Sequence, residues 1–234
     1  MRPLIKEMWV PSGLSNHPGR LMVSISKVTI HTTGNHNNNA TAEAHARLQF
    51  NGGGGRQASW HYSVDEGEIW QSFRDEQMCW HTGTRLGNEN SIGIEICVNS
   101  RKGFAAACEK AARLTAYLLS KHGLAIEDVA QHHCWSKKNC PAELRSAAWN
   151  ISWDDFINMV SAHMGDVPTE IAALRSAGVS FDEVHWQGVF TGAIKPNKDW
   201  TKILTARIID ARWGQLSLDD LKLSFMSLLG KRIP

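Results

Sequence analysis

The sequence predicts an α/β protein in which a central mixed β-sheet is flanked by helices, followed by a small helical module at the C-terminal end. Three observations predict this class. Strand-like and helix-like apolar patterns alternate over roughly residues 20–160, one of the strand-like segments is almost continuously apolar, and the pattern becomes helical after residue 165.

The first strand is expected at residues 28–31, where apolar and polar residues alternate. Val28 and Ile30 share one face of such a strand, and Thr29 and His31 share the other. His31 should therefore point away from the layer against which the two aliphatic side chains pack.

A second strand is expected at residues 91–98, where four β-branched side chains define one buried face: Ile92, Ile94, Ile96 and Val98. Gly93, Glu95 and Cys97 lie on the opposite face. The nearly continuous apolar character indicates a central strand, where a lone carboxylate suggests a function. A solvent-facing charge on an edge strand is the alternative explanation for Glu95.

Between these strands the sequence predicts a hairpin from Ser59–Val64 and Glu68–Phe73, joined by a turn that contains Gly67. Aromatic side chains on strands usually belong to the core. Four tryptophans could instead form apolar walls of a site: Trp60, Trp70, Trp80 and Trp135.

Two helices should cover the sheet. The first spans residues 41–50, with Thr41 as its N-cap and the glycines Gly52–Gly55 just past its end. The second spans residues 105–121, with apolar side chains at helical spacing and Gly123 after its last turn.

The chain then changes in character at the break Gly165–Pro168. Helical spacing recurs at Ile171 and Leu174 and again between Trp200 and Ala211, and Ser217–Asp220 resembles a capping box that opens a last helix. We therefore expect two domains, residues 1–160 and residues 165–234, the second being a compact module of about three short helices.

Composition excludes several classes of function. The chain has 234 residues, 42% of them hydrophobic and 21% charged, and a formal net charge of +2. This charge is too small to indicate a nucleic-acid partner, and no segment predicts a membrane span. The first residues lack the apolar stretch of a secretory signal, so synthesis in a reducing cytosol is expected.

The candidate chemistry lies in the segment Gln131–Pro141 and in His31, about a hundred residues earlier. Imidazole nitrogens and a thiolate suit Zn²⁺, and three protein ligands describe an open, catalytic site. His31, His132 and Cys140 supply such a set. A polar loop with a buried thiol, or a cysteine hydrolase using Cys140 or Cys134, would explain the same residues.

Five segments of the chain carry a further signal: Val28–Asn35, Ala58–Asp65, Trp80–Gly83, Asn90–Cys97 and Lys138–Pro141. In order and spacing they resemble the zinc-dependent N-acetylmuramoyl-L-alanine amidases that share a fold with peptidoglycan recognition proteins. The resemblance covers roughly residues 20–150.

The resemblance implies roles for single residues. His31, His132 and Cys140 correspond to the zinc ligands, Glu95 to a catalytic glutamate, and Lys138 to a basic residue that polarises the substrate carbonyl.

Two further positions bear on these roles. Some relatives use a tyrosine just before the histidine of the second segment, and this chain has Trp60 there, which favours Glu95 as the proton-transfer group. The family spacing of seven residues between histidine and cysteine selects His132 over His133, which is then expected beside the site or facing solvent.

By resemblance, the expected reaction is hydrolysis of the amide between N-acetylmuramic acid and L-alanine in bacterial peptidoglycan. A phage lysin made in the host cytoplasm without a signal peptide is the expected biological setting, and an exported host autolysin is the alternative. A non-catalytic peptidoglycan-binding module usually lacks the cysteine, so Cys140 argues against it.

The C-terminal module has two alternative roles. It could hold the enzyme on the wall, with Trp186, Trp200 and Trp213 as the first candidates for a glycan surface, or it could pack on the catalytic domain or mediate dimer contacts.

Overall fold

The computed structural model describes residues 3–164, 216–217, 219–221 and 223. The strands are β1 (Lys6–Glu7), β2 (Lys27–Thr32), β3 (Tyr62–Val64), β4 (Ile69–Gln71), β5 (Ser91–Ile96) and β6 (Val129–Gln131). The helices are α1 (Ala42–Phe50), α2 (Arg85–Asn90), α3 (Phe104–His122), α4 (His132–Ser136), α5 (Ala142–Arg145) and α6 (Trp153–Met164). Short 3-10 helices are η1 (Gly53–Gly55), η2 (Ile126–Asp128) and η3 (Ala148–Asn150).

The described strands form one mixed sheet with the order β1-β4-β3-β5-β2-β6. Strand β5 runs parallel to both of its neighbours, β2 and β3, whereas β3 and β4 form an antiparallel hairpin. Strand β6 extends the sheet in parallel beside β2. The predicted mixed sheet is confirmed, and β5 has the central position that its apolar residues indicated.

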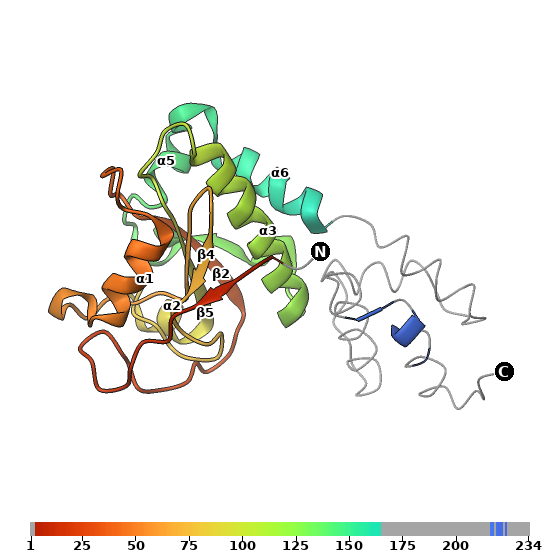
Figure 1. Ribbon diagram of the computed structural model, residues 1–234. Helices are drawn as coiled ribbons and strands as arrows, with labels where there is room; N and C mark the ends of the chain where they lie inside the picture. The colour runs from red at the N-terminus through yellow and green to blue at the C-terminus, as the bar shows by residue number, and fades with distance from the viewer. Residues whose placement is uncertain (1–2, 165–215, 218, 222, 224–234) are drawn as a thin grey trace. The chain divides into compact units, whose positions relative to one another are not determined.

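Helices lie on both sides of this sheet. In Figure 1, α1 is on the left of strands β2, β4 and β5, and the first part of α3 is on their right. His45 and Leu48 of α1 line the same cavity as Glu95 of β5, so α1 covers the sheet face that carries Glu95.

The opposite sheet face is the core. Val28, Ile30, Ile92 and Ile94 are fully buried, and each such side chain contributes roughly 1.5–3 kcal/mol relative to an exposed one. In the part of α3 up to Thr115, the buried side chains recur at helical spacing and are small or aliphatic: Ala107, Cys108, Ala111, Ala112 and Leu114. The alternation in the sequence thus separates an aliphatic face from a polar one.

The start of α1 is joined to the hairpin turn. Thr41 caps the helix as predicted, its Oγ1 accepting a hydrogen bond from the Ala44 N–H at 3.2 Å. The Asp65 carboxylate accepts three hydrogen bonds. One comes from the Ala42 N–H at the start of α1, at 2.7 Å, and the other two come from the backbone N–H groups of Gly67 and Glu68 in the hairpin turn. One buried carboxylate therefore fixes the turn and the helix to each other.

Glycine ends both predicted helices. After α1, Gly52–Gly55 all have positive φ, a region that other residues enter only with strain. Gly123, with φ of 63°, follows α3 in the left-handed conformation of a helix C-terminus.

By contact grouping, the described chain contains two units. One comprises residues 4–115 and 127–160 and holds the entire sheet; the other comprises residues 1–3, 116–126 and 161–234. The helical patterns predicted at 171–174 and 200–211, and Trp186, Trp200 and Trp213, lie outside the described residues. Ser217 is described, and its Oγ accepts a hydrogen bond from the Asp220 N–H at 3.0 Å, as the predicted cap requires.

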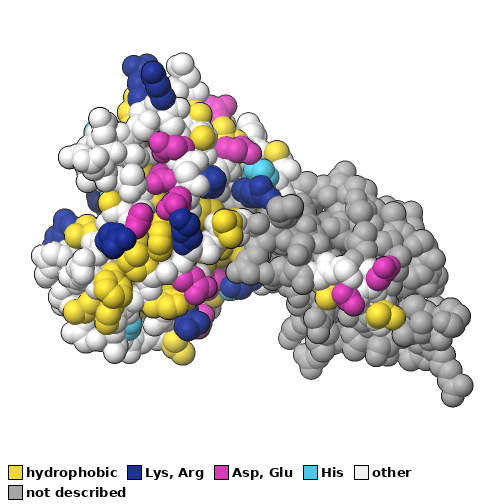
Figure 2. Space-filling model, in the orientation of Figure 1, with side chains coloured by type: hydrophobic (Ala, Val, Ile, Leu, Met, Phe, Trp, Pro, Cys, Tyr) yellow, Lys and Arg dark blue, Asp and Glu magenta, His cyan; other side chains and the backbone are white. Residues whose placement is uncertain are grey.

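The surface agrees with the charge balance of the sequence. Figure 2 shows acidic and basic side chains interspersed over the visible face of the described residues. Within the described part of the chain, no helix has both the length and the apolar character needed to cross a membrane.

Candidate metal centre and active site

His31 and Glu95 face each other on neighbouring central strands. They are register partners in the parallel pair β2 and β5, so their side chains project from the same face of the sheet. The His31 side chain is 1% exposed, and its Nδ1 atom lies 3.9 Å from Glu95 Oε1. The pairing of β2 with β5 therefore places the His31 imidazole beside the Glu95 carboxylate on one face of the sheet.

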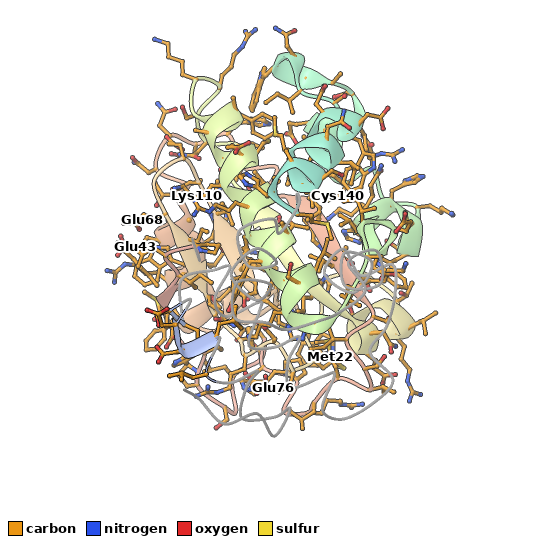
Figure 3. The ribbon with its side chains drawn as sticks, turned by 90° about the vertical axis from the view of Figure 1, so that its right-hand side faces the viewer. Met22, Glu43, Glu68, Glu76, Lys110 and Cys140 are labelled. Atoms are coloured by element: carbon orange, nitrogen blue, oxygen red, sulfur yellow. The ribbon has the colours of Figure 1, made fainter. Side chains whose placement is uncertain are left out.

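His132 and Cys140 reach the same position from the segment that follows β6. Because β6 pairs with β2, its end at Gln131 delivers His132 to the first residue of α4, beside His31. The Nδ1 atoms of His31 and His132 are 3.0 Å apart, and Cys140 Sγ is 3.8 Å from His31 Nδ1. Figure 3 labels Cys140, which lies beside strand β2.

These three residues form the one group of potential metal ligands found within the described residues. All three are buried, and their ligand atoms lie within 4.8 Å of one another. The structure thus brings together the three residues that the sequence singled out.

His133 points away from this group. Its Nδ1 lies 3.0 Å from the Lys138 carbonyl oxygen, and its backbone N–H donates to the Cys140 carbonyl oxygen at 2.9 Å. Lys137, with φ of 63°, makes the tight turn between them. His133 therefore closes the loop that presents Cys140.

Burial makes these groups neutral when no cation is present. It lowers the pKa of His31 well below its usual value, helped by His81, and it lowers the pKa of His132. It raises the pKa of the Cys140 thiol to about 12, with a further contribution from the Glu95 charge. With both Nδ1 atoms unprotonated and the thiol ionised, these three groups can bind a cation together. Two nitrogens and one sulfur are a donor set that fits Zn²⁺.

Glu95 lies beside the group without joining it. Its side chain is 16% exposed, and its Oε2 atom is buried without a hydrogen-bond partner. Burial raises the pKa of Glu95 to about 8, while the Lys138 charge lowers it and the Glu143 charge raises it. A carboxyl group with a pKa near neutrality can both accept and donate a proton.

A cavity of about 290 Å³ opens next to Glu95. Trp60 and Arg56 line it together with residues of α1. The Trp60 Nε1–H donates to Ser63 Oγ at 2.8 Å, which orients the ring. Trp60 therefore lines this cavity beside the carboxylate, as a wall residue of the site would.

Lys138 is exposed and has an electrostatic effect on Glu95 and on Cys140. It lies two residues before Cys140 in the chain.

Trp135 has a structural contact that its sequence position did not reveal. Its Nε1–H donates to Thr29 Oγ1 at 2.9 Å, and the Thr29 hydroxyl donates in turn to Ser91 Oγ at 2.9 Å. The ring also packs so close to α2 that a Cβ atom on Gly87 would lie 2.8 Å from it. Trp135 thus ties α4 to the sheet.

His81 is a site residue to which the sequence assigned no role. Its Nδ1 lies 3.0 Å from His31 Nε2, and its Nε2 lies 3.0 Å from the Ser91 carbonyl oxygen. A Cβ atom on Gly93 would come within 2.7 Å of this ring. A glycine inside a β-branched strand signals such a close approach, and Gly93 was the available clue.

The five cysteines are all unpaired thiols. Cys134 is exposed and is not part of the ligand group, and Cys108 is fully buried in α3. Because burial raises the pKa of Cys140, this thiol lacks the depressed pKa of a cysteine nucleophile. This disfavours a cysteine hydrolase that uses Cys140 as its nucleophile.

The described part of the chain thus has a mixed sheet flanked by helices, and one face of that sheet holds a buried His-His-Cys group beside a carboxylate. The chain belongs to the N-acetylmuramoyl-L-alanine amidase family, whose sequence model matches residues 22–143.

Relatives agree with this membership. The chain is 34% identical over 192 residues to N-acetylmuramoyl-L-alanine amidase XlyA of Bacillus subtilis, covering 77% of this chain and 61% of the relative. It is 33% identical over 161 residues to amidase CwlH of the same species, covering 68% of this chain and 61% of the relative. The chain thus spans less than two thirds of the length of these curated relatives.

Solved structures extend the similarity to the fold. The catalytic domain of XlyA superimposes with a TM-score of 0.61 at 36% identity, covering 68% of this chain and 99% of that structure. PlyL gives a TM-score of 0.61 at 26% identity, covering 68% of this chain and 98% of that structure.

Proposed function

We propose that this chain hydrolyses the amide bond between N-acetylmuramic acid and L-alanine in bacterial peptidoglycan, using Zn²⁺ held by His31, His132 and Cys140. The observation that supports this most strongly is the convergence of two Nδ1 atoms and one Sγ atom within 4.8 Å, beside a carboxylate with a partnerless oxygen. Family membership supports the choice of bond.

The protein residues supply the metal site and the proton chemistry. Three protein ligands leave one coordination position open, which is typical of catalytic and not of structural sites. Bound there, Zn²⁺ supplies a Lewis acid that makes water acidic near neutral pH and polarises a carbonyl group.

Glu95 is the proposed proton carrier. Its Oε1 is 3.9 Å from His31 Nδ1 and its Oε2 has no partner, so a water molecule attacking beside His31 can give its proton to this carboxylate. The amide C–N bond then breaks: the lactyl carbon keeps the water oxygen, and Glu95 returns the proton to the departing amine of L-alanine. Burial raises the pKa of Glu95 to about 8 in the metal-free protein, and a cation bound beside it would lower this pKa towards the range in which the carboxylate can accept a proton.

Lys138 is the proposed electrostatic partner of the substrate carbonyl. Its charge acts on the same space as that of Glu95 and Cys140. A fixed cation there stabilises the negative charge that develops on the carbonyl oxygen as water adds. The cavity beside Glu95, lined by Trp60 and Arg56, is the proposed entrance for the substrate.

The proposal is tested on purified peptidoglycan. Wild-type protein should release amino groups without new reducing ends, a chelator should stop the release, and added Zn²⁺ should restore it. Release of reducing ends would indicate a glycosidase. Release that continues in chelator would support a cysteine hydrolase, and wall binding with no release would support a non-catalytic module.

We also propose a lytic role for the protein on the bacterial wall and a separate helical module at residues 165–234. The similarity to the Bacillus amidases, together with a 40% identical match over 37 residues to Endolysin PlyTW of Staphylococcus phage Twort, supports the lytic role.

The proposed module at residues 165–234 is tested by fusing these residues to a fluorescent protein. Sedimentation of the fusion with walls supports a wall-binding module, and a soluble fusion supports a packing or dimer role.

A further inference from the structure

His81 contacts the Nε2 atom of His31, whereas Cys140 contacts its Nδ1 atom. Each ring nitrogen of His81 has one contact: Nε2 with the Ser91 carbonyl oxygen and Nδ1 with His31 Nε2, both at 3.0 Å. A carbonyl oxygen only accepts hydrogen bonds, so His81 Nε2 must carry the proton that is donated to Ser91.

This contact determines the tautomer of His31. Neutral His81 with a proton on Nε2 has a lone pair on Nδ1, and this lone pair accepts a hydrogen bond from His31 Nε2–H. A neutral His31 that donates from Nε2 carries no proton on Nδ1. The bare Nδ1 is the atom that faces His132 and Cys140.

The space for His81 is created by Gly93. A Cβ atom at this position would lie 2.7 Å from His81 Nδ1 and 2.9 Å from Cγ, distances at which the ring has to move. Gly93 lies in strand β5 between β-branched residues. Because Gly93 has no side chain, the His81 ring can pack directly against this strand.

The segment around His81 is itself held in place. Asn88 Oδ1 accepts hydrogen bonds from the backbone N–H groups of His81 and Thr82 and from the Thr82 hydroxyl, at 3.0, 2.9 and 2.9 Å. The backbone of Thr82 also makes a hydrogen bond with the ring of His132 that favours its protonated form, as a carbonyl acceptor does. The same short segment therefore touches both histidine ligands.

We propose that His81 is a positioning residue of the metal centre: by accepting the His31 Nε2–H, it fixes His31 in the tautomer and orientation whose bare Nδ1 binds Zn²⁺, and Gly93 provides the space for it. The inference rests on the proposed zinc function. Outer-sphere partners of metal-bound histidines commonly have this effect.

The first test detects the hydrogen bond itself. In protein with ¹⁵N-labelled histidine, a through-hydrogen-bond ¹⁵N–¹⁵N coupling should connect His31 Nε2 and His81 Nδ1, with the proton on His31. Its absence, or a proton on His31 Nδ1 in the metal-free protein, would overturn the proposal. This measurement needs neither substrate nor a variant.

The second test measures zinc affinity by competition with a chromophoric chelator. His81→Leu removes the acceptor and should raise the zinc Kd roughly 10- to 100-fold. His81→Asn keeps a side-chain acceptor near the Nδ1 position and should recover part of the affinity. Gly93→Ala leaves His81 in the sequence but forces its ring to move, so it should also raise the Kd.

The matched control is His17→Leu. His17 is a half-buried histidine whose Nδ1 accepts from the Gly19 N–H at 3.0 Å and whose ring packs on Phe73. This variant should bind zinc as wild type does. Thermal unfolding of each metal-free variant separates lost affinity from lost folding.

The outcomes distinguish this inference from the proposed function. Wild type that binds no zinc would overturn the proposed function together with this inference. Tight wild-type binding that is unchanged in folded His81→Leu and Gly93→Ala would overturn the role of His81 and leave the proposed function standing. Weaker binding in both, with partial recovery in His81→Asn, is the expected result.

Discussion

The two faces of strands β2 and β5 come from alternate residues of the same segments, yet they differ in chemistry. On one face, aliphatic side chains such as Ile30, Ile92 and Ile94 are fully buried. On the other, the His31 side chain is 1% exposed and that of Glu95 is 16% exposed. Glu95 Oε2 has no hydrogen-bond partner, and the Nδ1 atom of His31 lies 3.0 Å from that of His132. The aliphatic face is complete in itself, and the polar face is where we propose that a cation and a substrate bind.

This difference teaches that stability and chemistry are separable in this sheet. A polar group left buried without a partner weakens the fold, and such groups persist at sites where function needs them. Substitutions on the aliphatic face should therefore change the free energy of unfolding, and substitutions on the polar face should change zinc affinity or activity.

The largest expected effect is that of Cys140→Ser on the polar face. Removing a ligand should weaken zinc binding by more than the roughly 10- to 100-fold typical of outer-sphere changes, and wall hydrolysis should disappear. Chelator competition and the amino-group assay measure the two losses. Cys134→Ser, which alters an exposed thiol outside the group, is the control and should keep both properties. Retained zinc and activity in Cys140→Ser would remove Cys140 from the site.

Glu95→Gln should separate metal binding from catalysis. The variant keeps all three proposed ligands and should bind zinc, but it cannot carry a proton, so the rate of wall hydrolysis should fall about 10²- to 10⁴-fold. Glu43→Gln is the matched control, since Glu43 is an exposed partner of Arg47 and lies away from Cys140 in Figure 3. Full activity in Glu95→Gln would exclude Glu95 from the reaction.

Ile92→Ala should affect only the aliphatic face. Its side chain is fully buried, and truncating such a residue lowers the free energy of unfolding by about 2–5 kcal/mol. Denaturant unfolding measures this loss. The zinc Kd of the folded variant should match wild type, and a parallel loss of zinc affinity would show that the two faces are coupled.

A further prediction concerns the pH dependence of stability in the metal-free protein. Folding raises the pKa of Glu95 from 4.5 to about 8, so the folded state holds this proton more tightly than the unfolded state. The resulting stability is fully present below pH 4.5 and is lost as the pH rises to about 8.

The side chain in Glu95→Gln does not titrate, so the variant lacks this pH-dependent contribution to stability. The difference in the free energy of unfolding, wild type minus variant, should therefore fall as the pH rises through this window. Denaturant unfolding at a series of pH values measures it. A constant difference would mean that the carboxyl titrates normally in the folded protein.

Periodicity in the sequence was sufficient for much of the fold. The alternation in residues 28–31 and 91–98 predicted which side chains share a face, and the Thr41 cap and the hairpin turn were readable from residue type. These features are local, because they depend on neighbours only a few residues apart.

Apart from the group of His31, His132 and Cys140, the non-local contacts of the site could not be predicted from the sequence. The contact of His81 with His31 joins residues 50 positions apart, and that of Trp135 with Thr29 joins residues 106 positions apart. Periodicity contains no information on such pairs, and the choice of His132 over His133 came from the family spacing alone. Gly93 was the one local sign of the contact with His81.

The central claim is that the polar face holds one zinc ion with three protein ligands. The most direct measurement is the anomalous scattering of crystals grown with zinc, recorded above and below the zinc absorption edge. We predict one strong peak about 2.0–2.1 Å from the Nδ1 atoms of His31 and His132 and about 2.3 Å from Cys140 Sγ, with the Glu95 carboxylate nearby but not bound. A peak elsewhere, or a fourth protein ligand that closes the site, would contradict the account.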